Sequence, residues 1–197
     1  MKKTLILLLS FILILTGAFF IYNQLSTRYQ PPVEDITNHD TSNSSGNADS
    51  QNDTSTEEII PATDFTVYTK DGTAVNLSDF YGKPIVVNFW ATWCGPCKME
   101  LPAFDTLYQQ YKDQVHFLMV NLTDSVDETM ESVSDFVTKN NYTFPVYYDT
   151  DMDAALTYYI TSVPRTLFID SDGTIAYGYM GAISKDILET YIQEILD

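Results

Sequence analysis

The chain of 197 residues has few cysteines, few histidines and few basic residues. Its 10 Lys and Arg stand against 27 Asp and Glu, so the formal net charge is −17 at pH 7. Phosphate binding needs clustered cations, and this balance therefore argues against nucleic acid as a partner. Two cysteines cannot supply a scaffold of several disulfides or the four thiolates of a structural zinc site. They can form one bridge or one redox pair.

The first 22 residues are almost entirely apolar after a basic start. Lys2 and Lys3 precede an uncharged stretch of 18 residues, 5–22. At about 1.5 Å per residue this stretch approaches the roughly 30 Å hydrocarbon core of a bilayer. A cleaved signal peptide would have a shorter apolar region and a small-residue cleavage site, which is hard to place here. We expect residues 1–22 to be an uncleaved anchor with the rest of the chain outside the cytoplasm, and a cleaved signal is the alternative.

Residues 23–60 are rich in Ser, Thr, Asn, Asp and Gln. They hold seven acidic residues and one basic residue, Arg28. So few apolar side chains cannot offset the entropy lost on ordering, and we expect a disordered acidic tether. If flexible, it spans roughly 30–35 Å, at about 5–6 Å times the square root of its length. It would hold a domain away from the membrane.

Residues 61–197 alternate between strand and helix patterns, over a length that suits one hydrophobic core. Asp71-Gly72 and Asp172-Gly173 are turn signals that predict two hairpins. Between the hairpins, apolar runs predict buried strands, and apolar residues at helical spacing predict helices. We expect strands at 65–68, 75–77, 85–90, 117–120, 144–148, 166–169 and 175–177, and helices at 98–111, 126–137, 152–159 and 187–196. This order predicts an α/β fold with a central mixed sheet, helices on both faces and an N-terminal β-hairpin.

Both cysteines lie at one predicted strand-to-helix turn, in the run Trp93-Cys94-Gly95-Pro96-Cys97. A Cys at the start of a helix faces unpaired N–H groups and the positive end of the helix dipole, and both lower the thiol pKa. The two-residue spacer lets Cys97 attack a mixed disulfide on Cys94. Pro96 is tolerated early in a helix because its missing N–H had no partner there. The motif is typical of dithiol–disulfide exchange, with the cysteine pair itself as the redox group and no other cofactor.

Two other uses of the cysteines stay open. An inert disulfide staple would close a very short loop and so remove little entropy from the unfolded chain. A metal site would need two more ligands. His39 lies in the predicted tether and His116 starts a predicted strand. We therefore expect no metal ion at this turn.

The residues around the motif resemble the thioredoxin superfamily, and more closely its TlpA/ResA-like membrane-anchored thiol-disulfide oxidoreductases. The likeness covers about residues 61–197. Its most specific part is VVNFWATWCGPCKMELP at 86–102, and LSDFYGKP at 77–84 and SVPRTLFID at 162–170 belong to it as well. The resemblance implies a thioredoxin-like fold.

Two polar positions near the cysteines need separate interpretation. Asn88 stands where the resemblance to thioredoxin proper implies a buried Asp that helps to move the proton of the second cysteine, and Asn cannot titrate. Glu100 follows Cys97 by three residues, hence on the same helical face, and the resemblance implies a Glu there that tunes the cysteines. A carboxylate near Cys97 would raise its thiol pKa and could take its proton. The alternative for Glu100 is a solvated residue in the first turns of a helix, where acids are favoured.

Five residues are candidates for substrate binding. An X-Pro bond is cis in only about 5–6% of cases, but the resemblance implies a cis-Pro at Pro164, facing the cysteines. Val163 before it would pair with a substrate strand by β-addition. Trp93 is expected to form an apolar rim for docking, with core packing as its alternative. Gly95 and Pro96 complete the predicted substrate surface.

The resemblance implies an extracytoplasmic enzyme that reduces disulfides of exported proteins, with apocytochrome c among the substrates of such families. A membrane thiol carrier of the DsbD/CcdA kind would reduce the enzyme again. A thiol oxidase or isomerase is the alternative reaction. From other classes, a copper chaperone of the Sco type would need Cys-x-x-x-Cys and a late His, and a peroxidase would need Thr where Ala91 stands. A non-catalytic surface domain would keep its function without Cys94.

Overall fold

The computed structural model describes residues 60–124 and 128–197. The predicted anchor and nearly all of the predicted tether lie outside these residues, so the proposed domain boundaries stay predictions. Within the described ranges, no helix is long and apolar enough to cross a membrane.

The described residues form seven strands, four α-helices and one 3-10 helix. The strands are β1 (Thr66–Tyr68), β2 (Ala74–Asn76), β3 (Ile85–Trp90), β4 (His116–Asn121), β5 (Val146–Tyr148), β6 (Arg165–Ile169) and β7 (Ile175–Met180). The helices are η1 (Leu77–Phe80), α2 (Gly95–Tyr111), α3 (Met130–Lys139), α4 (Asp153–Thr157) and α5 (Lys185–Glu194). All strands join one sheet in the order β2-β1-β5-β4-β3-β6-β7. β4 is parallel to β3 and β5, and the other neighbours are antiparallel, so the predicted mixed sheet is confirmed.

Most of the predicted boundaries differ from the structure by a few residues, and for α2 and β2 the reason is local. α2 begins at Gly95 rather than at residue 98, because Cys94 caps the helix and Pro96 occupies its first turn. The second strand of the first hairpin stops at Asn76, whose N–H donates to Asp79 Oδ2 at 2.8 Å across the start of η1. α3 begins at Met130, while residues 125–127 of the predicted helix 126–137 lie outside the described residues.

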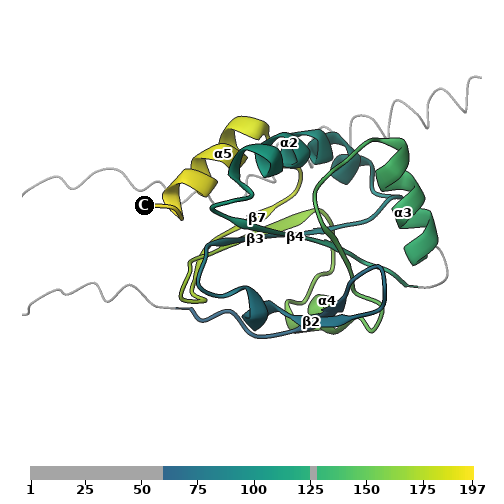
Figure 1. Ribbon diagram of the computed structural model, residues 1–197, viewed down its shortest axis with the longest axis horizontal. Helices are drawn as coiled ribbons and strands as arrows, with labels where there is room; N and C mark the ends of the chain where they lie inside the picture. Colours follow the sequence, from purple (N-terminus) through teal and green to yellow (C-terminus); the bar gives the residue numbers. More distant parts are fainter. Residues whose placement is uncertain (1–59, 125–127) are drawn as a thin grey trace, which may run out of the picture. The chain divides into compact units, whose positions relative to one another are not determined.

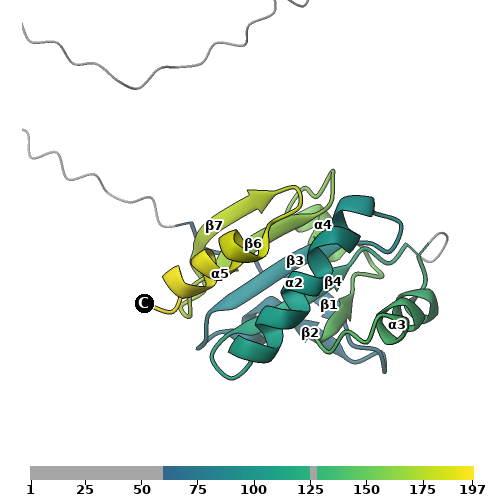
Figure 2. The same ribbon diagram turned by 90° about the horizontal axis from the view of Figure 1, so that it is seen from above.

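β3 lies inside the sheet, and its side chains alternate between two cores. Val86 and Trp90 belong to the core under α2, α3 and α5, whereas Val87 and Phe89 belong to the core beside α4. Successive side chains of a strand point to opposite faces, so Asn88 shares the α2 face. Figure 1 shows α2 and α5 on one side of β3 and β4, and α4 on the other. Seen from above in Figure 2, α2 and α5 lie side by side across the sheet. The expected helices on both faces are confirmed.

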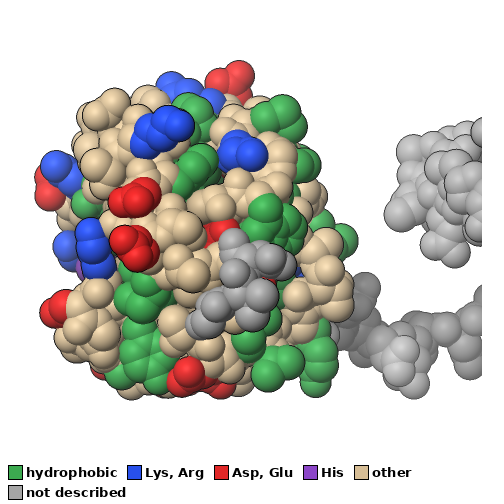
Figure 3. Space-filling model, turned by 90° about the vertical axis from the view of Figure 1, so that its right-hand side faces the viewer, with side chains coloured by type: hydrophobic (Ala, Val, Ile, Leu, Met, Phe, Trp, Pro, Cys, Tyr) green, Lys and Arg blue, Asp and Glu red, His purple; other side chains and the backbone are tan. Residues whose placement is uncertain are grey.

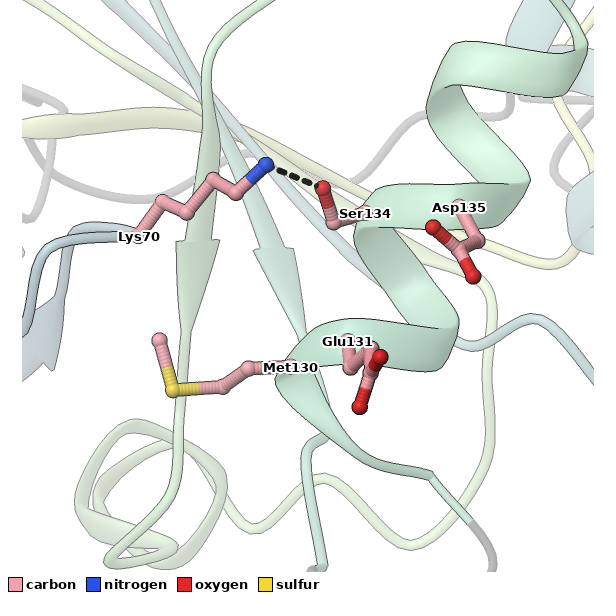
Figure 4. Close-up of a pocket in the computed structure, with 5 residues that line it drawn as sticks. All are labelled: Lys70, Met130, Glu131, Ser134 and Asp135. Carbon is pink, nitrogen blue, oxygen red and sulfur yellow. Dashed lines mark hydrogen bonds between the residues drawn. The ribbon is translucent and has the colours of Figure 1, made fainter.

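Two hollows lie between the turn that joins β1 to β2 and helix α3. One has a volume of about 280 Å³ and the other about 230 Å³. Lys70 lines both hollows, and its Nζ donates to Oγ of Ser134 at 2.6 Å (Figure 4). Neither hollow is lined by any of the residues predicted to form the site.

Candidate active site

Cys94 is the N-cap residue of α2. Its Sγ accepts a hydrogen bond from the backbone N–H of Cys97 at 3.1 Å. That N–H belongs to the first turn, where a helix leaves its donors without partners. The bond that caps the helix would therefore also stabilise a thiolate at Cys94.

The two cysteines form a disulfide, with Cα atoms 5.3 Å apart. Cys94 is 5% exposed, and Cys97 is fully buried. Cys94 is therefore the more accessible residue of the pair, and Cys97 has no surface that a substrate sulfur could reach. This difference in access fits attack by Cys94 and resolution by Cys97.

The chain at Val163 and Pro164 faces the sulfur of Cys94. The peptide bond between these two residues is cis, as predicted. The carbonyl oxygen of Val163 lies 3.6 Å from Sγ of Cys94. A disulfide sulfur carries no hydrogen, so this is a contact in the oxidised form, whereas a thiol at Cys94 could donate to the carbonyl. The N–H of Gly181, just after β7, donates to the Pro164 carbonyl at 2.9 Å and ties this segment to the sheet.

Glu100 is buried on α2, with 2% of its surface exposed. Its Oε1 accepts from Nδ2 of Asn88 at 2.9 Å, and its Oε2 accepts from the N–H of Ile183 at 2.8 Å. Burial raises the pKa of Glu100 to about 7, although both hydrogen bonds act to lower it. The alternative of a solvated carboxylate is therefore wrong. A carboxyl with a pKa near neutrality can accept and return a proton at the pH where exchange takes place.

Asn88 connects β3 to α2 and β6 from inside the core. Besides Glu100, its Nδ2 reaches Oγ1 of Thr166 at 3.1 Å. Its Oδ1 has no hydrogen-bond partner among the described residues. An unpaired buried oxygen of this kind costs about 1–3 kcal/mol. Because Asn88 cannot titrate, Glu100 is the group of this pair that can carry a proton.

Trp93 stands at the open side of the site. It is 58% exposed, which rules out core packing, and Gly95 and Pro96 beside it are exposed as well. Met180, at the end of β7, is 77% exposed. The carboxyl ends of β3, β4 and β7 lie at the right-hand side of Figure 1, and Figure 3 shows this end of the molecule with hydrophobic side chains gathered over part of it. The surface around the sulfurs is therefore partly apolar, and a docking role for Trp93 stays a prediction.

The sequence analysis missed a second buried carboxylate near the cysteines. Glu128 is fully buried, and its oxygens accept hydrogen bonds from Thr92, two residues before Cys94, and from Asn121. A signal for it existed, because Asn121 is a polar residue that ends a buried strand parallel to β3. The carboxyl ends of parallel strands meet at one edge of a sheet, where polar side chains gather.

Within residues 60–124 and 128–197, no group of three or more His, Cys, Asp or Glu side chains could hold a metal ion. His116 starts β4, as predicted, and its ring lies 5.4 Å from that of Phe80. His39 lies outside the described residues. The cysteine pair has no histidine beside it in the described structure to complete a metal site.

Comparison with known proteins identifies the family of the chain. The AhpC/TSA family matches residues 60–178. The thiol-disulfide oxidoreductase ResA of Oceanobacillus iheyensis is 40% identical over 126 residues, which are 64% of this chain and 64% of that protein, just under two thirds of its length. ResA of Bacillus thuringiensis subsp. konkukian is 35% identical over 135 residues, 68% of this chain and 76% of the relative. The crystal structure of StoA from Bacillus subtilis is similar with a TM-score of 0.58 and 28% identity, over 68% of this chain and 98% of that one. The chain therefore belongs to the AhpC/TSA family and, within this thioredoxin-like family, to the thiol-disulfide oxidoreductases of the ResA type.

Proposed function

We propose that this protein reduces disulfides of exported proteins through the dithiol of Cys94 and Cys97. The observation that carries the proposal is the position of the Cys94 sulfur, which caps α2 and accepts the N–H of Cys97 at 3.1 Å. A thiolate in this position gains a charge-assisted hydrogen bond and the favourable end of the helix dipole. Of the two cysteines, Cys94 keeps a small exposed fraction of 5%, whereas Cys97 has none.

The proposed reaction begins with attack of the Cys94 thiolate on one sulfur of a substrate disulfide. A mixed disulfide forms, and the other substrate sulfur leaves as a thiolate that takes up a proton. Cys97 gives its proton to Glu100 and then attacks Sγ of Cys94. The Cys94–Cys97 disulfide forms and the second substrate sulfur leaves as a thiolate, which takes up the proton that Glu100 accepted, so the substrate gains the two electrons that the enzyme loses. Glu100, with a pKa of about 7, is suited to accept that proton at neutral pH.

The substrate would dock on the open side of the sulfurs. Trp93, Gly95 and Pro96 offer exposed surface there, and an extended substrate segment would lie along Val163, whose carbonyl is 3.6 Å from the Cys94 sulfur. Main-chain pairing of this kind tolerates many side chains. It suits an enzyme with protein substrates of varied sequence.

We further propose that the catalytic domain works outside the cytoplasm, attached to the cell membrane through residues 1–22. Lys2 and Lys3 before an uncharged stretch support this orientation. An enzyme in that location would depend on a membrane thiol carrier of the DsbD/CcdA kind to return it to the dithiol form. Cytochrome c maturation, with apocytochrome c as a substrate, is the pathway that the ResA-type resemblance favours.

The reduction potential of Cys94–Cys97 tests the direction of the reaction. It would be measured on the full-length protein equilibrated with glutathione or dithiothreitol. A potential near the value of about −270 mV known for thioredoxin supports a reductant, whereas one near about −120 mV, as in DsbA, supports the alternative of a thiol oxidase. A protein that does not exchange with dithiothreitol at all contradicts both.

A further inference from the structure

The fully buried carboxylate of Glu128 is held by donors from two strand ends. Its Oε1 accepts from the N–H of Thr92 at 2.6 Å and from Nδ2 of Asn121 at 2.7 Å, and its Oε2 accepts from Oγ1 of Thr92 at 2.5 Å. A buried carboxylate is unfavourable unless such bonds compensate for the lost water. The proposed exchange reaction does not use this group.

The bond to Thr92 replaces the next step of the β3–β4 ladder. The parallel pairing runs to Trp90 opposite Asn121, and the N–H of Leu122 still donates to the Trp90 carbonyl at 3.0 Å. In a continuing parallel ladder, the N–H of Thr92 would next donate to the carbonyl of Leu122. The N–H of Thr92 donates to Glu128 Oε1 instead. The ladder therefore ends at Thr92, and the chain is free to leave the strand direction.

The chain turns immediately after this point. The N–H of Cys94 donates to the carbonyl of Ala91 at 3.3 Å, and α2 begins at the next residue. The clamped residue Thr92 lies inside this turn. Thr92 is therefore the residue through which Glu128 contacts the turn that carries Cys94.

We propose that Glu128 is a positioning residue for the redox centre: by clamping Thr92 at the end of β3, it holds the Cys94 sulfur where the first turn of α2 stabilises the thiolate. The inference rests on the proposed function, because it concerns the sulfur that carries the exchange. A hydrogen bond to a thiolate is stronger than one to a neutral sulfur. Loss of the hydrogen bonds between Glu128 and Thr92 should therefore destabilise the dithiol form more than the disulfide form.

The test is Glu128→Gln in the full-length protein. The amide keeps the shape of the side chain but has no negative charge, so the bonds from Thr92 and Asn121 lose their charge-assisted strength and the bond with Oγ1 of Thr92 must reverse its direction. We expect the equilibrium with glutathione to move toward the disulfide by about tenfold, which is roughly 30 mV for a two-electron couple. The alkylation rate of Cys94 by iodoacetamide should also rise at a higher pH than in the natural protein.

Asp149→Asn is the matched control. Asp149 is also fully buried, and its oxygens accept the N–H groups of Ala154 at 3.1 Å and Ala155 at 2.8 Å at the start of α4. This change should lower the melting temperature but leave the glutathione equilibrium within about twofold. Thr92→Val, which removes the hydroxyl bond to Glu128 alone, should shift the equilibrium in the same direction as Glu128→Gln and by less.

The outcomes separate this inference from the proposed function. The positioning role alone is overturned if the natural protein exchanges with glutathione and Glu128→Gln is less stable but has the same glutathione equilibrium and the same alkylation profile. A natural protein that does not exchange contradicts the proposed function, and the inference with it. If Glu128→Gln does not fold, Thr92→Val decides in its place, and an unchanged equilibrium in that variant overturns the inference.

Discussion

Asn88 donates a hydrogen bond from Nδ2 to Oε1 of Glu100 at 2.9 Å inside the core. This bond favours the ionised carboxylate, whereas burial favours the protonated one. Burial has the larger effect, and the pKa of Glu100 is raised to about 7. Glu100 therefore changes its protonation near neutral pH, three residues along α2 from the resolving cysteine.

The first prediction concerns the roles of the two sulfurs. Cys97→Ser should accumulate a mixed disulfide between Cys94 and a substrate protein, because Cys94 is the attacking residue and no second thiol remains to resolve the product. Cys94→Ser should form no such adduct and should lose exchange activity to the background rate. Mass spectrometry after reaction with a protein disulfide measures both results. Trapping by Cys94→Ser instead would reverse the roles, and full function in Cys94→Ser would indicate a non-catalytic domain.

The second prediction concerns stability and pH. The pKa of Glu100 is higher in the folded protein than in the unfolded chain, so between about pH 4.5 and 7 the folded state binds the extra proton. Stability should therefore fall as the pH rises through this window, by up to about 3 kcal/mol at 1.36 kcal/mol per pKa unit. Glu100→Gln has no charge to bury and should lack this loss. Urea unfolding at pH 4.5, 6 and 7.5 measures it.

If the stability of the natural protein and that of Glu100→Gln fell equally with rising pH, groups other than Glu100 would cause the loss of stability. Asp149 is the matched control, because burial also raises its pKa but its carboxylate caps α4. Asp149→Asn should leave the pH dependence of cysteine alkylation unchanged. Glu100→Gln should alter that dependence, because it removes the proposed acceptor of the Cys97 proton.

The third prediction concerns Asn88→Asp. This change places a second carboxyl within hydrogen-bond distance of Glu100, and two such groups cannot both ionise easily. The apparent pKa values then belong to the pair, and the upper one should lie above 7. The pH profile of kcat/KM for disulfide exchange should move to higher pH by about one unit or more. Thr166→Val removes the other partner of Asn88 without adding charge, and it should leave the profile in place. An unmoved profile in Asn88→Asp would mean that Glu100 does not take part in proton transfer.

The fourth prediction compares two tryptophans. Trp93→Ala should change the free energy of unfolding by no more than about 0.5 kcal/mol, as is usual for exposed side chains. It should raise KM for protein disulfides more than it lowers kcat. Trp90→Ala should instead destabilise the fold by about 3–5 kcal/mol, because Trp90 is fully buried. Chemical unfolding and exchange kinetics measure the two effects, and an unchanged KM in Trp93→Ala would remove Trp93 from the docking surface.

Much of the fold could be predicted from local patterns. The strand at 85–90 has the predicted bounds, and the final helix and both hairpins were predicted to within a few residues. Apolar periodicity, turn residues and the cysteine spacing are all local properties of the chain, and they report directly on local structure. For the same reason the sequence located the redox pair at the start of a helix.

The surroundings of the site depend on tertiary structure. Helical spacing placed Glu100 on the face of Cys97, but its burial depends on β3 and on Ile183, 83 residues away along the chain. Glu128 accepts a hydrogen bond from Thr92, 36 residues earlier in the chain, because the ends of the parallel strands β3 and β4 lie side by side. The sequence alone therefore determined which groups carry the chemistry. The tertiary structure decided their protonation and positions, because desolvation and hydrogen-bond partners come from residues that are distant in sequence.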